Sequence, residues 1–219
     1  WLCFPRFDSE ACFAALLGTP ENGRWSIRPR DGQARSTRRY RDGTLILETT
    51  FETAEGAATL IDFMPPRDRC ADLIRIVVGH RGRVEFDVDL AIRFNYGRSI
   101  PWVSHLDKTT LTAVAGPDLL VLRTAVELHG EDMHTVGSFT VTAGQRIPFT
   151  LTHGASHLSV PPPRDPEVAL EKTEAFWTVF SERCPRVGTW TPEVKRSLIT
   201  LKALTYMPTG GIVRSEERR

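Results

Sequence analysis

Hydrophobic and polar residues alternate along the chain from Arg38 to His153. The alternation is clearest in VEFDVDLAIRF, residues 84–94, where a hydrophobic residue occupies every second position and mostly charged residues lie between. Because successive side chains of a β-strand point to opposite faces of the sheet, this segment is predicted to be a strand with one buried face. A period of two over so long a stretch predicts antiparallel sheets.

Short glycine-containing segments interrupt the alternation and predict tight turns between neighbouring strands. Glycine adopts a positive φ at no steric cost, and hairpin turns require such backbone. The predicted turns are AEGA (54–57), HRGR (80–83), GPD (116–118) and AGQR (143–146). Successive hairpins with no long helix between them predict sheets packed face to face.

The pattern becomes helical after the proline-rich segment VPPPRDP, residues 160–166. Proline lacks a backbone donor and has a fixed φ, so this segment is expected to be a connector. Asp165 is placed to cap a helix that begins at Pro166 and continues to Cys184. The apolar positions at helical spacing are Val168, Phe176, Val179 and Phe180.

A second amphipathic helix is predicted after Thr191, which is expected to cap it, with Pro192 in the first turn. Its apolar stripe comprises Val194, Leu198, Leu201 and Leu204. Because nothing follows that would cover the stripe, its last three leucines are candidates for self-association into a homodimer. The final six residues, RSEERR, are almost all charged and are expected to be a disordered tail.

The charge of the chain is nearly balanced, with 28 lysines and arginines against 27 acidic residues among 219 residues. The basic residues are scattered, so no surface for nucleic acid or an anionic membrane is expected. No apolar run approaches the roughly 20 residues of a transmembrane helix, and no signal-peptide pattern is present.

The four cysteines are far apart and never form a C-x-x-C pair, so a structural zinc site is not expected. They are Cys3, Cys12, Cys70 and Cys184. Reduced thiols buried as small hydrophobic groups fit this spacing better than a disulfide framework does. The pattern therefore favours a cytoplasmic protein.

The other candidates for chemistry are weak. The densest group of possible metal ligands is His129, Glu131, Asp132 and His134. It lies in a charged loop with no further ligand at a familiar spacing, so solvated side chains are favoured over a metal. HGASH, residues 153–157, has a serine near histidines but neither a nucleophile elbow nor an orienting acid. No phosphate-binding glycine motif is present, and no cofactor is expected.

Several ordered motifs are similar to those of one enzyme family. They are W-L-x-x-P-R-F-D-S (Trp1–Ser9), G-x-x-x-N-G-R-W (Gly18–Trp25), RRYRDGTLILETTFET, DFMPP, RFNYG and LKALTYMPTGGIV. Through them, essentially the whole chain resembles the amino-terminal region of bacterial glycoside hydrolase family fifteen. That family includes glucoamylase, glucodextranase and trehalase-like proteins.

The resemblance implies a mainly β architecture, an antiparallel supersandwich of two large packed sheets over residues 1–160, with the family's first hairpin missing upstream of Trp1. It implies a linker helix within 161–190. Residues 191–219 would be the first helix of a truncated helical catalytic domain and the charged tail.

The same resemblance implies that the chain alone is not an enzyme. The family cleaves α-glucosidic bonds with inversion, using one carboxylic acid and one carboxylate. Both belong to the catalytic barrel, so no catalytic residue is assigned here. The expected partner is that barrel, which this domain would support and whose cleft it would shape. Trehalose, starch-type glucans and dextran all stay open as substrates of the parent protein.

Two segments are candidates for contact with sugar or with the barrel. Arg6 could bind a carboxylate or sugar hydroxyls and Phe7 could stack on a pyranose face; alternatively, Arg6 and Asp8 fix a turn and Phe7 is a core residue. Tyr96 and Trp102 flank a glycine-containing turn at a strand end, where binding loops are common, and packing is again the alternative.

Two further functions remain open. One is a stand-alone carbohydrate-binding module for α-glucans or trehalose. The other is an enzyme similar to the sugar mutarotases, which needs a histidine and a carboxylate facing one pocket. No such pair is identifiable in the sequence.

Overall fold

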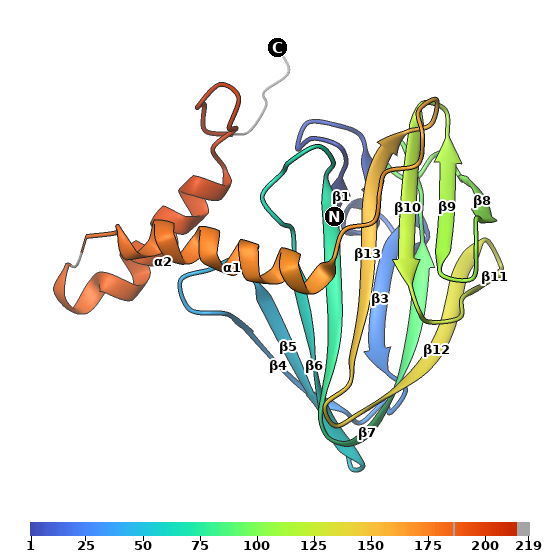
Figure 1. Cartoon of the computed structure of the whole chain (residues 1–219), viewed down its shortest axis with the longest axis horizontal. Helices are drawn as coiled ribbons and strands as arrows, with labels where there is room; N and C mark the ends of the chain where they lie inside the picture. The colour runs from blue at the N-terminus through green and yellow to red at the C-terminus, as the bar shows by residue number, and fades with distance from the viewer. Residues whose placement is uncertain (186, 214–219) are drawn as a thin grey trace.

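The structure is a computed structural model that describes residues 1–185 and 187–213 (Figure 1). The predicted charged tail lies outside the described residues. The strands are β1 (Leu2–Cys3), β2 (Ala11–Phe13), β3 (Arg24–Pro29), β4 (Arg35–Tyr40), β5 (Leu47–Glu52), β6 (Gly56–Phe63), β7 (Asp72–Ala91), β8 (Trp102–His105), β9 (Thr110–Ala115), β10 (Asp118–Thr124), β11 (His129–Glu131), β12 (His134–Thr142) and β13 (Arg146–Ala155). The helices are α1 (Pro166–Glu182) and α2 (Thr191–Ala203), with short 3-10 turns η1 (Ala15–Leu17), η2 (Pro20–Asn22) and η3 (Gly188–Trp190).

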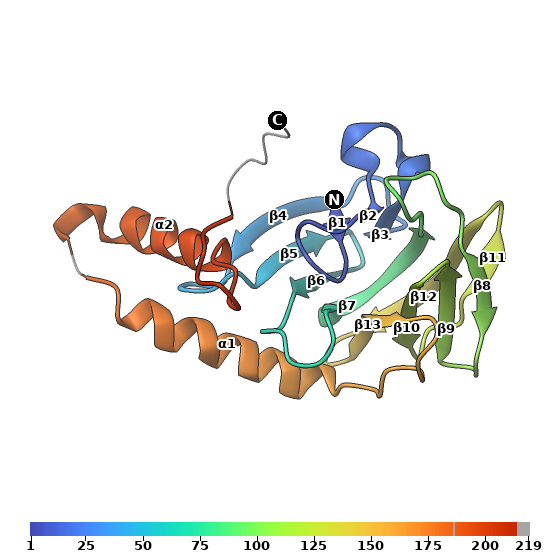
Figure 2. The same cartoon turned by 90° about the horizontal axis from the view of Figure 1, so that it is seen from above.

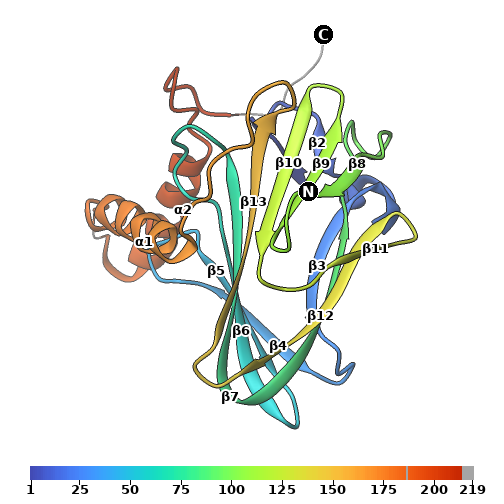
Figure 3. The same ribbon diagram turned by 45° about the vertical axis from the view of Figure 1, so that its right-hand side comes forward.

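Apart from β1 and β2, which pair with each other, the strands form two packed antiparallel layers, and β7 belongs to both. The larger layer has the order β4-β5-β6-β7-β13-β10-β9-β8, and the smaller consists of β11, β12, the second half of β7 and β3. Figure 3 shows the layers meeting where β7 bends. The predicted fold class, a mainly β antiparallel sandwich with a linker helix and one further helix, is confirmed.

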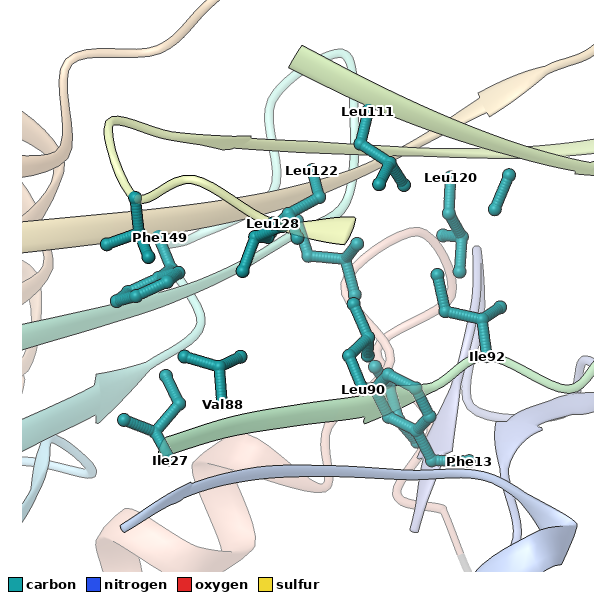
Figure 4. Close-up of a cluster of buried hydrophobic side chains, with 14 of the residues drawn as sticks. Phe13, Ile27, Val88, Leu90, Ile92, Leu111, Leu120, Leu122, Leu128 and Phe149 are labelled. Atoms are coloured by element: carbon teal, nitrogen blue, oxygen red, sulfur yellow. The ribbon is translucent and has the colours of Figure 1, made fainter. Parts of the chain in front are cut away.

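The main core lies between the two layers. Val88, Leu90 and Ile92 face Leu120 and Phe149 of the opposite layer (Figure 4). Every second residue from Val84 to Phe94 is at most 7% exposed, as the alternation predicted. Burying each such side chain contributes about 1.5–3 kcal/mol, so this face of β7 is a large share of the stability.

The predicted hairpins at residues 80–83 and 143–146 are wrong, whereas those at 54–57 and 116–118 are confirmed. Residues 80–83 lie inside β7, whose first half pairs with β6 and β13 and whose second half pairs with β12 and β3. The chain through residues 143–146 does not fold back on itself either. β12 and β13 both run antiparallel to β7, one after the other.

The bend in β7 depends on Gly82. Its φ is +59°, and a Cβ there would lie 1.9 Å from the backbone oxygen of Glu55. Hydrogen bonds continue across the bend, from the Gly79 amide to the Gln145 carbonyl (3.0 Å) and from the Ala143 amide to the Gly82 carbonyl (3.2 Å). The two strands therefore bend together and keep their backbone groups paired.

Helix α1 covers the outer face of the larger layer. Asp165 Oδ1 accepts from the amides of Glu167 (2.9 Å) and Val168 (3.1 Å), which confirms the predicted cap. The predicted apolar face is wrong in part, because Val168, Phe176 and Val179 are exposed and Phe180 is half-buried. The buried positions are Ala169, Leu170, Thr173, Trp177 and Ser181. Ala169 and Leu170 pack on Ile46, Ile61, Phe63, Ile74 and Ile76 of the sheet side.

The segment before α1 is fixed to the sheet. Asp72, which is 3% exposed, accepts a hydrogen bond from Thr152 Oγ1 (2.6 Å) and forms an ion pair with Arg164, with 2.9 Å between Oδ2 and Nε. Arg123 Nη2 donates to the carbonyl of Pro161 (2.5 Å). The proline-rich connector therefore lies along the sheet.

Helix α2 is attached to the β4–β5 hairpin by polar contacts. Arg196 Nη1 donates to the Thr44 carbonyl (2.7 Å), and its guanidinium lies 4.8 Å from the Tyr40 ring centroid. Thr191 is the first helical residue rather than the predicted cap, because its Oγ1 donates instead to the Gly188 carbonyl (2.7 Å). Ile199 is the buried residue of this helix.

We expect Gly82→Ala to destabilise the fold much more than Gly116→Ala. Both glycines have nearly the same φ, +59° and +57°, but a Cβ at Gly116 meets open space. Gly116→Ala should therefore cost only the left-handed strain, about 1–2 kcal/mol, and Gly82→Ala at least about 3 kcal/mol because the backbone must also shift. Urea unfolding measures both, and equal losses would contradict the role given to the bend.

Candidate functional site

A cleft of about 440 Å³ lies between β8, the β11–β12 turn and the second half of β7. Trp102 and Met133 are its most exposed hydrophobic residues, at 79% and 72%. Its other lining residues are Leu90, Ile92, Arg93, Ile100, Pro101, Val103, His105, Leu111, Gly130, Glu131, Asp132, His134 and Thr135. The cleft thus combines an apolar floor, an exposed indole and charged groups at its rim.

A buried arginine holds one side of this cleft. Arg93 is 5% exposed, and its Nη1 donates to the carbonyls of Ile92 (2.9 Å) and Met133 (3.0 Å). Asp132 and Met133 both have a positive φ, +47° and +62°. Non-glycine residues in that region cost about 1–3 kcal/mol each and persist only where neighbours enforce them. Arg93 supplies part of that enforcement.

His134 joins three segments beside the cleft. Its Nδ1 lies 2.6 Å from Asp89 Oδ1 on β7, and its Nε2 lies 3.2 Å from Glu21 Oε2 on η2. Arg24 of β3 pairs with the other oxygen of Asp89. The hydrogen bond to Asp89 is the main reason that the pKa of His134 is raised above its ordinary value of 6.5. This histidine–carboxylate network was not identifiable from the sequence, because its members are far apart along the chain.

The network has little capacity for proton transfer to a ligand. Both ring nitrogens of His134 already bond to carboxylates. His153 likewise bonds Asp118 (3.0 Å), and Ser156 Oγ donates to the Gly116 carbonyl (2.7 Å). His134 and His153 therefore give the mutarotase-like alternative no support, whereas His105 does line the cleft together with Glu131 and Asp132.

The N-terminal candidates lie together, next to the segment that follows α2. Arg6 makes two hydrogen bonds to Asp8, from Nε (2.9 Å) and Nη2 (2.6 Å), which is the turn-fixing alternative. The guanidinium of Arg6 lies 5.3 Å from the Tyr206 ring centroid, and the Phe7 ring packs edge-on against Tyr206 at 5.7 Å. Phe7 is 47% exposed, so it is not a core residue.

The structure separates the remaining aromatic pair. Tyr96 packs against Trp1, with 5.8 Å between ring centroids, and does not line the cleft of Trp102.

The leucines predicted to mediate self-association lie on and just after α2. Leu198 is half-buried, and Leu201 and Leu204 are 46% and 41% exposed.

The groups considered for metal or redox chemistry are dispersed. His129 Nε2 lies 3.8 Å from Glu131, and His134 bonds elsewhere. Within residues 1–185 and 187–213, no group of three or more histidine, cysteine or acidic side chains could hold a metal ion. The four cysteines are free thiols, and burial raises the pKa of Cys12 to about 12.

None of the described helices is long and apolar enough to span a membrane.

A family model described as "Trehalase-like, N-terminal" matches residues 1–177. The chain therefore belongs to the family of trehalase-like N-terminal domains. It is 29% identical to the trehalase of Mycolicibacterium smegmatis and 23% identical to that of Thermoplasma volcanium, over 97% of this chain in each case. These alignments cover 36% and 35% of the relatives, so the chain spans about a third of the length of the curated relatives it matches.

Two further likenesses are more limited. A 107-residue part of the chain is 34% identical to trehalase 1 of Sulfolobus acidocaldarius, covering 49% of this chain and 18% of that protein. A solved structure titled a putative kojibiose phosphorylase from the human microbiome matches 81% of this chain and 27% of its own, with 10% identity and a TM-score of 0.38. That last likeness is too distant to support an argument.

We expect His134→Gln to cost most stability at acidic pH. A histidine whose folded pKa is raised stabilises fully below its unfolded value, about 6.5, and loses that contribution as pH rises through the folded pKa. The difference in unfolding free energy between His134→Gln and the unmodified chain should therefore shrink from pH 6 towards pH 9. In an Asp89→Asn background, which removes the main partner, the same substitution should show a flatter pH profile. A profile unchanged by Asp89→Asn would contradict this origin.

Proposed function

We propose that this chain is the non-catalytic N-terminal domain of a glycoside hydrolase similar to bacterial family fifteen, of the trehalase or glucoamylase type. The observation that carries the proposal is the family match over residues 1–177, together with trehalase relatives about three times as long. The domain supports a helical catalytic barrel, which hydrolyses an α-glucosidic bond with inversion, and shapes the barrel's cleft. Trehalose is the favoured substrate because the curated relatives are named trehalases.

The arrangement of the helices supports this division of the chain. We assign residues 1–160 to the β domain, 161–190 to the linker, and 191–219 to the start of the catalytic domain. Both helices lie at one end of the sandwich (Figure 2), and the Phe7 and Arg6 side chains already contact Tyr206 beyond α2. The N-terminal segment is thus an interdomain contact.

Hydrophobic side chains left exposed by the helices supply a surface for the barrel. They are Val168, Phe176, Val179, Trp190, Leu201, Leu204, Met207 and Ile212, each at least 40% exposed. So many exposed apolar groups along one end of a chain are typical of an interface.

We propose a cytoplasmic location for the protein, because its four cysteines are free thiols and the cytoplasm is reducing.

The sharpest test replaces the matching first third of the Mycolicibacterium smegmatis trehalase with residues 1–219 of this chain. We expect the chimaera to fold and release glucose from trehalose, the deletion of that third to be inactive, and this chain alone to release no glucose. A deletion as active as the chimaera would refute the supporting role. Glucose release by this chain alone would refute its non-catalytic assignment.

We also expect the isolated chain to self-associate through the exposed face of α2. Leu198→Glu with Leu201→Glu should shift the sedimentation coefficient towards the monomer, because charges at an apolar contact are costly to bury. The control is Leu16→Glu with Leu17→Glu, two leucines on η1 that are 79% and 73% exposed. An unmodified chain that sediments as a clean monomer would contradict the homodimer.

A stand-alone carbohydrate-binding function is the second candidate. The observation that favours it is the position of Trp102 in the cleft described above.

A further inference from the structure

We propose that the cleft between β8 and the β11–β12 turn is a saccharide-binding site in which one pyranose ring stacks on Trp102. The choice of a saccharide rests on the proposed function. The cleft itself and its chemistry do not, because they are properties of the described residues alone.

The exposed indole is the first argument. Trp102 is 79% exposed on an edge strand, although Trp25 and Trp177 of the same chain are packed into the body. Trp102 is the most exposed of the five tryptophans, and it lines a cleft with an apolar floor, so a ligand seated there would cover its ring. The C–H face of a pyranose matches such a ring in size and shape, and its hydroxyls remain free for polar contacts.

The lining of the cleft suits those hydroxyls. Glu131, Asp132 and His105 are exposed at its rim, and the buried guanidinium of Arg93 lies at its wall. These groups supply both acceptors and donors in the same cleft as the indole. The two rim carboxylates disfavour an anionic ligand, and a neutral polyhydroxylated ligand can use both the acceptors and the donors of the lining.

The size and rigidity of the cleft support the same occupant. Its volume of about 440 Å³ is within the range of small-molecule sites. Arg93 holds the Met133 carbonyl, and with it the strained turn opposite Trp102. A wall fixed in this way lowers the entropic cost of binding, which matters for a ligand with few apolar contacts.

The cleft is separate from the surface assigned to the barrel. β8 and β11 lie at one end of the molecule, and α1 and α2 lie at the other (Figures 1 and 2). A saccharide in the cleft therefore leaves the exposed faces of both helices uncovered.

The test is calorimetric titration of the full chain with trehalose, maltotriose and isomaltotriose, with tryptophan fluorescence as a second readout. We expect saturable binding of at least one of them with a dissociation constant in the millimolar range, and at least tenfold weaker binding by Trp102→Ala. Trp190→Ala is the matched control, since Trp190 is 68% exposed on η3 at the helical end, and it should bind as the unmodified chain does. Trp102→Phe, which keeps a flat ring, should retain part of the affinity. Thermal unfolding of each variant verifies that it is folded.

Three results would overturn the proposal: no binding of any of the three saccharides, undiminished binding by folded Trp102→Ala, or equal losses in Trp102→Ala and Trp190→Ala. The trehalase chimaera separates this failure from failure of the proposed function. An active chimaera without saccharide binding rejects the cleft alone, and binding beside an inactive chimaera rejects the supporting role alone.

Discussion

The sandwich depends on two paired strands that bend together. A single strand that crossed from one layer to the other would leave its amides and carbonyls without partners at the crossing, and each such buried group is costly. Here the segment from β12 to β13 follows β7 through the bend, so hydrogen bonds between Gly79 and Gln145 and between Gly82 and Ala143 persist there. Both layers contain part of β7, and the core between the layers and the cleft at the end of β7 are both lined by its residues.

Local sequence patterns predicted which face of a strand is buried, but they did not predict which strands pair with one another. The alternation from Val84 to Phe94 identified the buried face correctly because burial imposes a period of two on any strand. The glycines in residues 54–57 and 80–83 present the same local signal. Only the first segment closes a hairpin, since the outcome at Gly82 is decided by strands that are distant in sequence. In α1 the residues that face the body are Ala169, Leu170 and Trp177, whereas Val168, Phe176 and Val179 face outward. Apolar residues at helical spacing lie on both sides of this helix, so the spacing alone did not identify the side that meets the sheet.

The candidate site was predictable only one residue at a time. Trp102 stands out in the sequence as an aromatic residue near a strand end, and the structure does place it in a cleft. Tyr96 has the same signal but turns towards Trp1. The groups opposite Trp102 come from other strands, and His134 and Glu21 meet across 113 positions of the chain. Such a juxtaposition exists only once the long-range pairing of β7 is formed.

The contact between Asp72 and Arg164 has a mechanical consequence. Asp72 is a buried carboxylate in the sheet, so releasing Arg164 would remove its ion-pair partner and leave it with the hydrogen bond from the Thr152 hydroxyl, which is unfavourable. The proline-rich connector is therefore held against the sheet at the end next to α1, and it is not a flexible linker there. The start of α1 therefore takes its position from the sheet, and the packing of Ala169 and Leu170 fixes the direction in which the helix leaves the sandwich.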